Sequence, residues 1–417
     1  MNGSIRRRTS GWLSAIRRSV WRVGWPATDK DRAAAMISSF FLHIHPARVS
    51  RHVLRPTYTF ALGLIAAILF LVLSVTGLAL MLYYVPHPPE AYRSMKDLQF
   101  VVTFGVVLRN MHRWSAHAMV AVVFLHMCRV FWTGSYKAPR EFNWVIGVLL
   151  LLLTLALSFT GYLLPWDQLA YWAITVGSNI AAYAPLVGDR VKFLLLAGHV
   201  IGPMTLLRFY VLHCVVLPLA VVALVSVHIW RVRKDGLSGA EAHAVPVEEV
   251  AGAFPPSTKT HGLMALARRP RTSVEARDPD DEVFAWPHLL YRELLVALGV
   301  VIVLHVVSLS FMAPLEEMAD PTRTPNPAKA PWYFLGLQEL VHYSALIGGV
   351  IVPTLIVLAL VVLPYVDRTR GGAGQWFAPE RRWINAIFTV LVVAFVSLTM
   401  IGTFFRGANW AWVWPWK

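Results

Sequence analysis

Seven long stretches of the chain carry almost no charged residue, and they constrain its fold more than any other feature. They lie near residues 58–83, 114–132, 144–164, 210–230, 294–312, 345–366 and 384–405. Each has about 19–26 residues, the length that an α-helix needs to cross roughly 30 Å of hydrocarbon at about 1.5 Å per residue. A core helix of a soluble protein rarely stays apolar for so long. The pattern therefore predicts an all-α, polytopic membrane protein with about seven transmembrane helices.

The basic residues indicate how this protein lies in the membrane. A formal net charge of +15 would by itself suggest a nucleic-acid partner. Most of the 38 Lys and Arg residues, however, precede the first apolar stretch or follow the second, fourth and sixth, which places them on one side. Because cytoplasmic loops carry an excess of Lys and Arg, we expect a cytoplasmic N-terminus, a periplasmic C-terminus and no nucleic-acid partner. The expected location is a bacterial inner membrane.

Composition divides the chain into four parts. Residues 1–57 are basic and partly amphipathic, and "IRRRTSGWLSAIRRSVWRVGW" would suit an anionic lipid surface. Residues 58–230 hold four spans, and residues 231–289 are rich in Pro, Gly and charge, which is typical of a cytoplasmic linker. Residues 290–417 hold three further spans. No cleavable signal peptide is expected, since the first apolar stretch begins only near residue 58.

Four histidines in the second and fourth spans are the strongest functional signal. Ionisable residues within membrane spans are rare and usually functional. His112 and His126 lie 14 residues apart, and His213 and His228 lie 15 apart. On a regular helix these intervals leave the members of each pair about 40° and about 60° apart, on one face.

The two spans run in the same direction, so the histidines match in depth. His112 faces His213 near the outer side, and His126 faces His228 near the inner side. Two imidazoles that face each other across a bundle suit a bis-histidine iron centre. We therefore predict two b-type haems in a four-helix di-haem bundle, the outer iron held by His112 and His213 and the inner iron by His126 and His228. A zinc site is less favoured, because zinc ligands cluster at one point.

Glycines and arginines support this prediction. Gly63 and Gly77 in the first span, and Gly147 and Gly161 in the third, are both fourteen residues apart. Glycine allows a neighbouring group to approach the backbone, so each is expected to receive a haem face; ordinary helix packing would not explain the shared interval. The cations expected near haem propionates, some of which could instead be interface anchors, are Arg109, Arg113, Arg208 and Arg129.

The chain has two cysteines, Cys128 and Cys214, and no CxxCH motif. Neither a covalent c-type haem nor an iron–sulfur cluster is therefore expected on it. Both cysteines lie in spans, where we expect them to be small packing residues. His305 is expected to be a hydrogen-bonded packing residue, and His342 is left without a role.

Several stretches resemble cytochrome b of the quinol-oxidising bc-type and bf-type complexes. They are "HRWSAHAMVAVVFLHMCRVFWTGSYKAPRE", "SFTGYLLPWDQLAYWA" and "LLRFYVLHCVVLPL". The likeness is strong over about residues 36–240 and looser over 290–405. The 15-residue histidine interval and Arg233, five residues beyond His228, resemble the bf arm of the family. The three C-terminal spans resemble the separate fourth subunit of that arm, here fused through the linker.

The resemblance implies a subunit of a respiratory or photosynthetic quinol:cytochrome c (or related carrier) oxidoreductase. Such a subunit oxidises quinol at the outer side, passes electrons through two non-covalent b haems and reduces quinone near the cytoplasmic face, in a proton-translocating Q cycle. The implied partners are a Rieske iron–sulfur protein, a cytochrome c-type subunit or carrier, quinone and membrane lipid. The implied assembly is a homodimeric complex of several subunits.

The resemblance also assigns residues to the two quinone sites. At the quinol-oxidation pocket it places Pro165, Trp166, Asp167 and Gln168 of "PWDQ", together with Tyr171, Trp332 and Tyr333. At the quinone-reduction end it places Arg233 and Lys234, where cations would stabilise a reduced quinone anion.

The sequence departs from the family in two places. Ala61 stands where the bf arm has a cysteine that tethers an extra haem, so that tether is not expected. Pro331 in "APWYF" stands where the family's PEWY or PDWY motif has its acid. Glu339, seven residues past Trp332, would lie some 20° from it around a helix and is our candidate for the missing base. Asp167 is the rival, and proton release through water is the alternative.

Two other function classes remain open. One is a cytochrome b that anchors a dehydrogenase or hydrogenase in the membrane, against which "PWDQ" and "PWYF" in long outer loops argue. The other is a haem-free transporter with ionisable residues at the membrane midplane.

Overall fold

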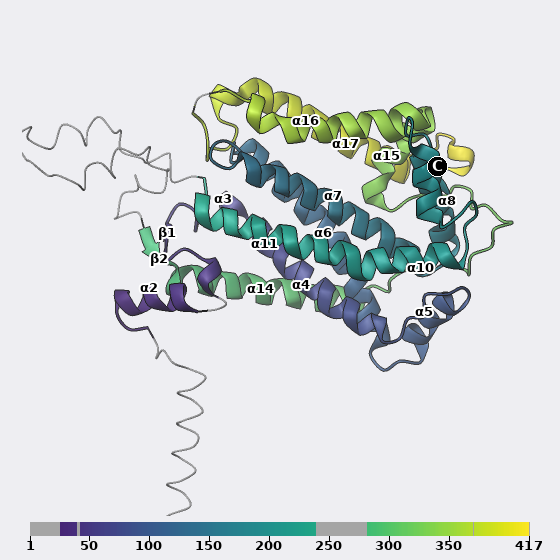
Figure 1. Cartoon of the computed structure of the whole chain (residues 1–417), viewed down its shortest axis with the longest axis horizontal. Coiled ribbons are helices and arrows are strands. Elements are labelled where there is room, and N and C mark those ends of the chain that lie inside the picture. The colour runs from purple at the N-terminus through teal and green to yellow at the C-terminus, as the bar shows by residue number, and fades with distance from the viewer. Residues whose placement is uncertain (1–25, 40–41, 239–281, 370, 417) are drawn as a thin grey trace, which may run out of the picture.

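The computed structural model describes residues 26–39, 42–238, 282–369 and 371–416. Within them, seven helices are long and apolar enough to cross a membrane. These helices run side by side along the long axis of the molecule (Figure 1). The prediction of an all-α protein with about seven spans is therefore confirmed.

The spans are single helices or helices continued across an irregular turn. They are α4 (Leu62–Met81), α6 (Gly105–Trp132), α7 (Glu141–Leu163), α10 (Pro203–Val211) continued by η2 (Leu212–Val216) and α11 (Leu217–Asp235), α14 (Ala285–Ser310), η5 (Ile347–Ile351) continued by α16 (Val352–Val366), and η6 (Pro379–Arg381) continued by α17 (Arg382–Phe404).

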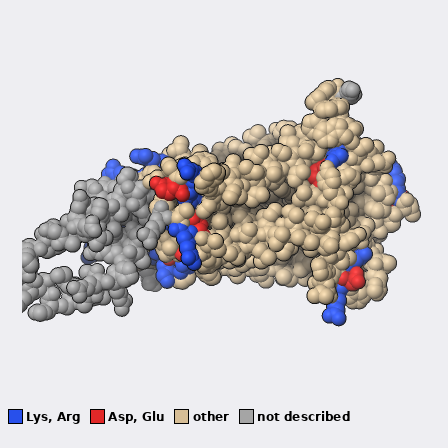
Figure 2. All heavy atoms as spheres, turned by 90° about the horizontal axis from the view of Figure 1, so that it is seen from above, with Lys and Arg blue, Asp and Glu red and all other residues tan. Residues whose placement is uncertain are grey.

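The surface agrees with a membrane location. In the face shown in Figure 2, Lys, Arg, Asp and Glu gather towards the two ends of the molecule, and the belt between them carries almost none. Large apolar side chains within the spans, such as Leu71 in α4, Leu298 in α14 and Val393 in α17, are exposed. Hydrocarbon solvates such side chains, whereas water would not. The protein is an integral membrane protein.

Shorter elements cover the two ends of the bundle (Figure 1). At one end lie α5 (Glu90–Phe100), α8 (Gln168–Ala182), α9 (Gly188–Leu196) and α15 (Trp332–Tyr343). At the other lie α2 (Asp29–Ser38), α3 (Pro56–Thr59) and the antiparallel strands β1 (Arg48–Ser50) and β2 (Glu282–Phe284). We call these the outer and the inner end, after the predicted orientation. The basic segment 5–25 and most of the linker lie outside the described residues, so the four-part division stays a prediction.

The second span begins earlier than hydropathy predicts. α6 starts at Gly105, and its first turns contain polar and charged residues. Arg109 donates hydrogen bonds to the carbonyl oxygens of Ala313 (2.9 Å) and Pro314 (2.7 Å). The amide of Asn110 donates to the carbonyl of Ser308, 2.9 Å away. These side chains face protein rather than lipid, which is why the helix extends through a stretch that is not apolar.

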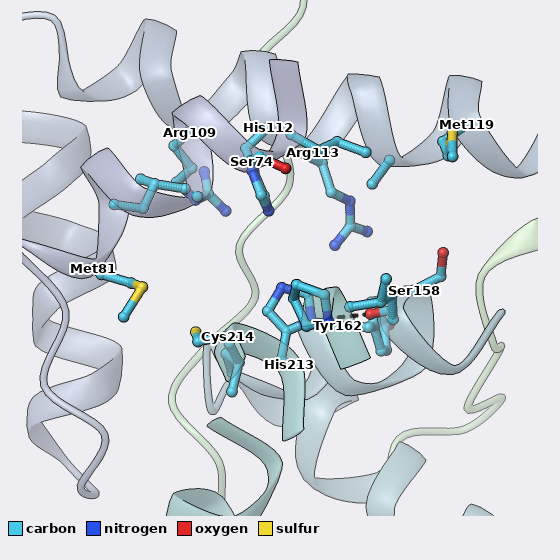
Figure 3. A pocket seen from close by; sticks show the side chains of 18 of the residues that line it. Ser74, Met81, Arg109, His112, Arg113, Met119, Ser158, Tyr162, His213 and Cys214 are labelled. Carbon is cyan, nitrogen blue, oxygen red and sulfur yellow. Dashed lines mark hydrogen bonds between the residues drawn. The ribbon is translucent and has the colours of Figure 1, made fainter. Parts of the chain in front are cut away.

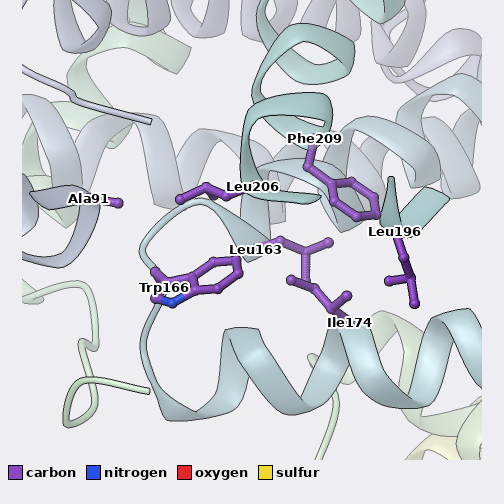
Figure 4. Close-up of a cluster of buried hydrophobic side chains, with 7 residues drawn as sticks. All are labelled: Ala91, Leu163, Trp166, Ile174, Leu196, Leu206 and Phe209. Carbon is purple, nitrogen blue, oxygen red and sulfur yellow. The ribbon is translucent and has the colours of Figure 1, made fainter. Parts of the chain in front are cut away.

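An apolar cluster fixes the outer end of the bundle (Figure 4). It joins side chains from α5, α7, α8, α9 and α10 with one from the loop after α7: Ala91, Leu163, Trp166, Ile174, Leu196, Leu206 and Phe209. Burial of this apolar surface holds the long loop after α7 against the ends of the spans. A second cluster, which includes Cys128 and Phe388, joins α6 to α17 nearer the inner end.

Arg381 organises the inner end. Its side chain is fully buried and donates to the carbonyl of Phe131 (3.0 Å) and to the Tyr136 hydroxyl (2.7 Å). Its Nε lies 3.5 Å from the carboxylate of Asp367, which also accepts a 2.7 Å hydrogen bond from Tyr136. One guanidinium thus connects α6, the loop that follows it and the end of α16 to the start of α17.

We expect Arg381→Met to lower the midpoint of thermal unfolding markedly. Removing one partner of a buried ion pair leaves the other charge uncompensated, which costs about 3–5 kcal/mol. The neighbouring Arg382 is exposed, so Arg382→Met is the matched control and should leave the midpoint within a degree or two. Unfolding followed by circular dichroism in detergent measures both, and equal midpoints for the two variants would contradict the role given to Arg381.

Candidate functional site

A cavity of about 330 Å³ lies among α4, α6, α7 and the α10–α11 span. His112 and His213 point into it from opposite sides (Figure 3). Their ring centres are 6.3 Å apart. The structure thus brings together the outer pair of histidines that the sequence predicts.

Two threonines orient the rings of this pair. Thr76 Oγ1 donates to the carbonyl of Val72 (2.7 Å) and Thr160 Oγ1 to that of Ala156 (2.9 Å). Each hydroxyl must therefore accept from the imidazole Nδ1 that it faces, at 2.9 Å in His112 and 3.2 Å in His213. Both Nδ1 atoms then carry the proton, and both Nε2 atoms present a lone pair.

A π-helical turn explains the unequal histidine intervals. A regular helix over the whole fourth span would leave His213 and His228 about 60° apart. The structure instead has a π turn, η2, at Leu212–Val216, and it contains His213. A π turn holds one residue more than an α turn, so it absorbs the fifteenth residue. The α10–α11 histidines can then match the 14-residue pair on α6.

All four predicted glycines lie opposite a predicted histidine. A methyl group on Gly63 would come within 3.3 Å of His126 Cε1, and one on Gly77 within 3.2 Å of His112 Cε1. A methyl group on Gly161 would overlap the His213 ring, whereas one on Gly147 would lie 3.7 Å from His228 Cε1. The shared fourteen-residue interval therefore reflects the space that the four imidazole rings, and any group bound by them, need beside α4 and α7.

The inner pair lies at a second, smaller cavity. His126, His228 and Gly147 line this space of about 110 Å³, together with Arg129, Arg140 and Arg231. His126 Nδ1 and Arg129 Nη2 are buried and have no hydrogen-bond partner among the described residues. A buried polar atom without a partner costs about 1–3 kcal/mol, so both atoms indicate a polar group bound here.

The donor set and the cavity shapes fit bis-histidine haem. Two imidazole nitrogens that each lie about 2 Å from a metal put the ring centres roughly 6 Å apart, close to the separation of His112 and His213. Glycines leave space beside each ring, and arginines line both cavities. Among the described residues no group of three or more His, Cys, Asp or Glu side chains could hold a metal ion, which argues against a zinc site.

The predicted propionate partners differ in position. Arg109 and Arg113 line the outer cavity, and Arg129 lines the inner one. Arg113 also lies over the Tyr162 ring, 5.1 Å from its centre. Arg208 does not line the outer cavity; it donates to the carbonyl of Leu194 in α9. These observations do not support the predicted pairing of Arg208 with an outer propionate, since its side chain is directed towards α9.

The "PWDQ" motif joins the two outer loops. The Asp167 carboxylate caps α8 by accepting from the amide of Ala170 (2.9 Å), and it also accepts from the amide of Glu316 (3.2 Å). The Gln168 side chain exchanges hydrogen bonds with the backbone of Asp320. Of the motif, only Pro165 lines the cavity. Trp166 lies in the apolar cluster of Figure 4, with Tyr171 packed against it.

Asp167 therefore has a structural role. Burial raises the pKa of its carboxyl, and the hydrogen bonds from the two amides oppose that rise. One oxygen binds the start of α8 and the other binds the loop after α14, and the side chain does not line the cavity. These contacts do not support the expected place of Asp167 in the quinol pocket.

Glu339 does not point into the cavity either. Its buried carboxylate accepts from Nε (2.8 Å) and Nη2 (2.9 Å) of Arg406 and from the indole of Trp410 (3.0 Å). These contacts do not support the prediction that Glu339 replaces the missing acid, since this bidentate ion pair joins α15 to the chain after α17. Helical position alone could not reveal it, since Arg406 is distant in sequence.

The two aromatic residues after Pro331 behave differently. Tyr333 lines the outer cavity, and burial raises the pKa of its hydroxyl to about 12. Trp332 is 38% exposed, and its indole nitrogen lies 3.0 Å from Nδ1 of His117. His117 itself lines the cavity and was not singled out from the sequence.

Arg233 and Lys234 are exposed and do not line the inner cavity. Lys234 lies over the Trp230 ring, at 5.2 Å. Arg231, Arg140 and Arg129 are the cations that line this cavity, which does not support the expected placement of Arg233 and Lys234 beside it. Arg233 lies about 200° from Arg231 around α11, so the two side chains point to opposite sides of the helix.

Five residues at the two sites were not predicted from the sequence. His117, Arg140 and Arg231 line the cavities, and Thr76 and Thr160 contact the outer histidines. The threonines had a readable signal, because each directly precedes one of the glycines, in Thr76-Gly77 and Thr160-Gly161. Nothing comparable marks His117.

Comparisons with known proteins agree with this geometry. A family model described as cytochrome b/b6/petB matches residues 47–236, and one described as cytochrome b (C-terminal)/b6/petD matches residues 318–414. The first covers the bundle of the four histidines, and the second covers α15 to α17. Both matches agree with the expectation that this chain fuses a cytochrome b6-like N-terminal part to a C-terminal part that resembles a separate subunit of the family.

Individual proteins are similar to the N-terminal half. Cytochrome b6 of Heliobacterium mobile is 44% identical over 194 residues, which are 46% of this chain and 89% of that protein. Cytochrome b6 of Prochlorococcus marinus (strain MIT 9211) is 44% identical over 180 residues, 43% of this chain and 83% of that protein.

A chain of a hyperthermophilic respiratory Complex III has the same fold over 90% of this chain and 88% of its own length, with a TM-score of 0.71 at 24% identity. The match extends the likeness in fold beyond the N-terminal half. Family models and relatives together are decisive: the chain belongs to the cytochrome b/b6 family.

Proposed function

We propose that the chain is the cytochrome b subunit of a quinol:electron-acceptor oxidoreductase and binds two non-covalent b-type haems. The observation that carries the proposal is the pair of depth-matched histidine sets on α6 and the α10–α11 span, each with a glycine beside its ring. A histidine that only made a structural hydrogen bond would not need a glycine beside its ring.

The chain's own residues prepare the haem sites. Thr76 and Thr160 fix the outer imidazoles with Nε2 free, which orients both ligands before binding. Arg113 at the outer cavity and Arg129 at the inner one would compensate the charge of propionates. The apolar walls exclude water. Bound haem iron supplies one-electron oxidation and reduction.

Quinol oxidation is assigned to the outer end of the outer cavity. Pro165 and Tyr333 line it from the two loops that Asp167 and Gln168 join. In the proposed Q cycle, one electron leaves through a Rieske iron–sulfur protein to a cytochrome c-type subunit or carrier. The other electron crosses the membrane to a quinone-reduction site. Protons are released outside and taken up inside, which makes the reaction proton-translocating.

Quinone reduction is assigned to the inner end. Arg129, Arg140 and Arg231 line the inner cavity, and cations there would stabilise a reduced quinone anion. The complex is proposed to be a homodimer of several subunits in a bacterial inner membrane, with the N-terminus in the cytoplasm. A membrane-anchor cytochrome b would need no joined outer loops, so the loop contacts favour the quinol-oxidising role.

We expect His126→Ala and His228→Ala each to remove the inner haem and leave the outer one assembled. His112→Ala and His213→Ala should do the reverse, because each iron needs both of its imidazoles. Dithionite-reduced difference spectra of the purified complex separate the two components. Loss of the same component from His126→Ala and His213→Ala would refute the pairing.

Gly161→Ala should disturb the outer haem, because the new methyl group would overlap the His213 ring. Gly147→Ala is the matched control, since its methyl group would make an ordinary 3.7 Å contact with His228. The measurements are haem content and the position of the α-band. An intact outer component in Gly161→Ala would contradict the close packing proposed here.

Acid–acetone extraction should strip all haem from this polypeptide. Ala61 replaces the tethering cysteine, and the sequence has no CxxCH motif. Haem staining of the isolated chain after denaturing electrophoresis gives the answer, with a covalent c-type cytochrome as the positive control. A stained band at the size of this chain would exclude purely non-covalent binding.

A further inference from the structure

His117 occupies an unusual position between two hydrogen-bond donors. It lies on α6 between the two haem-ligand positions, lines the outer cavity and packs edge-on against Tyr333, with ring centres 5.6 Å apart. Its Nδ1 is 3.0 Å from Nε1 of Trp332, and its Nε2 is 3.0 Å from Nε of Arg113. The two haem sites do not use its ring.

These two contacts cannot both be hydrogen bonds to a neutral imidazole. The indole of Trp332 and the guanidinium of Arg113 only donate, and a neutral imidazole has one accepting nitrogen. Its other nitrogen carries a proton that faces a donor. One contact must therefore open, at the nitrogen that carries the proton. The other nitrogen keeps its lone pair and accepts from one of the two donors, which a hydroxyl group in the cavity can displace.

A quinol hydroxyl is such a group, and the outer cavity needs a base. Pro331 stands where the family has its acid, Asp167 is held by two backbone amides, and Glu339 is held by Arg406. Among the described residues, no Asp or Glu side chain lines this cavity. The cavity's other histidines, His112 and His213, are assigned to the iron.

We propose that His117 is the catalytic base of the outer site and accepts the proton of a quinol hydroxyl in place of the missing carboxylate. This inference rests on the proposed function. The quinol hydroxyl displaces the donor at the lone-pair nitrogen of His117. Its O–H bond then breaks, the proton forms an N–H bond on that nitrogen, and the electron pair stays on the quinol oxygen. The proton of the second quinol hydroxyl leaves to water at the outer side. The two electrons then leave to the acceptors named above, an iron–sulfur protein and the membrane-crossing path.

The groups around His117 define the expected pH dependence. Arg113 lies one turn away on the same helix, Tyr333 faces the ring from α15, and Tyr162 of α7 faces Arg113. Only the neutral imidazole can accept a proton. The rate of quinol oxidation should therefore rise with pH as His117 loses its proton, and then level off.

The test compares wild-type complex with His117→Asn, which keeps a hydrogen-bonding side chain but cannot act as a base near neutral pH. We expect outer-site quinol oxidation to fall roughly tenfold or more and the rising limb of the pH profile to disappear. Haem spectra and haem reduction through the inner site should stay as in wild type. His305→Asn, on an exposed position of α14, is the matched control and should change neither rate nor profile.

A second variant separates base chemistry from packing. Pro331→Glu in the His117→Asn background restores a carboxylate where the family has it, at the N-cap of α15 where acids are favourable. We expect it to recover at least part of the lost rate, with a rising limb at lower pH. A His117→Asn rate and profile equal to wild type would overturn the role of His117, and so would a lost rate that Pro331→Glu does not restore even in part.

The proposed function can fail separately. A wild-type complex with two b haems that oxidises no quinol would overturn the proposed function and the role of His117 with it. A wild-type complex that oxidises quinol with a pH profile unchanged by His117→Asn would overturn only the role of His117.

Discussion

Four imidazole rings have to be accommodated in the apolar interior of the bundle, and much of the local structure follows from this constraint. A ring needs space, and glycines on α4 and α7 provide it opposite each histidine. A ring nitrogen needs a partner, and Thr76 and Thr160 provide one for the outer pair. The histidines on α6 and on the α10–α11 span must also lie at matching depths. The π turn at Leu212–Val216 absorbs the one extra residue between His213 and His228, which would otherwise rotate one of these two histidines away from its partner.

The outer end follows a second rule, that backbone polar groups close to the hydrocarbon need partners within the protein. Arg109 and Asn110 satisfy carbonyls at the end of α14 and in the loop that follows, and Asp167 and Gln168 bind the backbone of the same loop. Asp167 and Gln168, which the sequence suggests as active-site residues, therefore connect the loops at the outer end of the cavity. Their polar groups bind the protein backbone, whereas Tyr333 and His117 line the cavity.

The loss of the family's acid at Pro331 fits this division of labour. Both carboxylates that are near it in sequence or in motif are committed to structure, one to a helix cap and a loop, the other to Arg406. Buried, paired carboxylates are poor proton acceptors, because protonation would break contacts that hold them. His117 at the cavity wall faces one donor at each ring nitrogen and is not committed to an ion pair, so it does not have that disadvantage.

The sequence by itself determined the spans, their number and the two facing histidine pairs. Hydropathy, helical period and the fourteen-residue glycine interval are local or strictly periodic signals, and a helix in lipid has few other ways to satisfy its backbone. Only the tertiary structure decided the partners of Asp167, Glu339 and Arg208, and it alone revealed His117. Those outcomes depend on which distant segment lies opposite a side chain, as Arg406 lies opposite Glu339 and Trp332 opposite His117, and no spacing along one helix encodes such a contact.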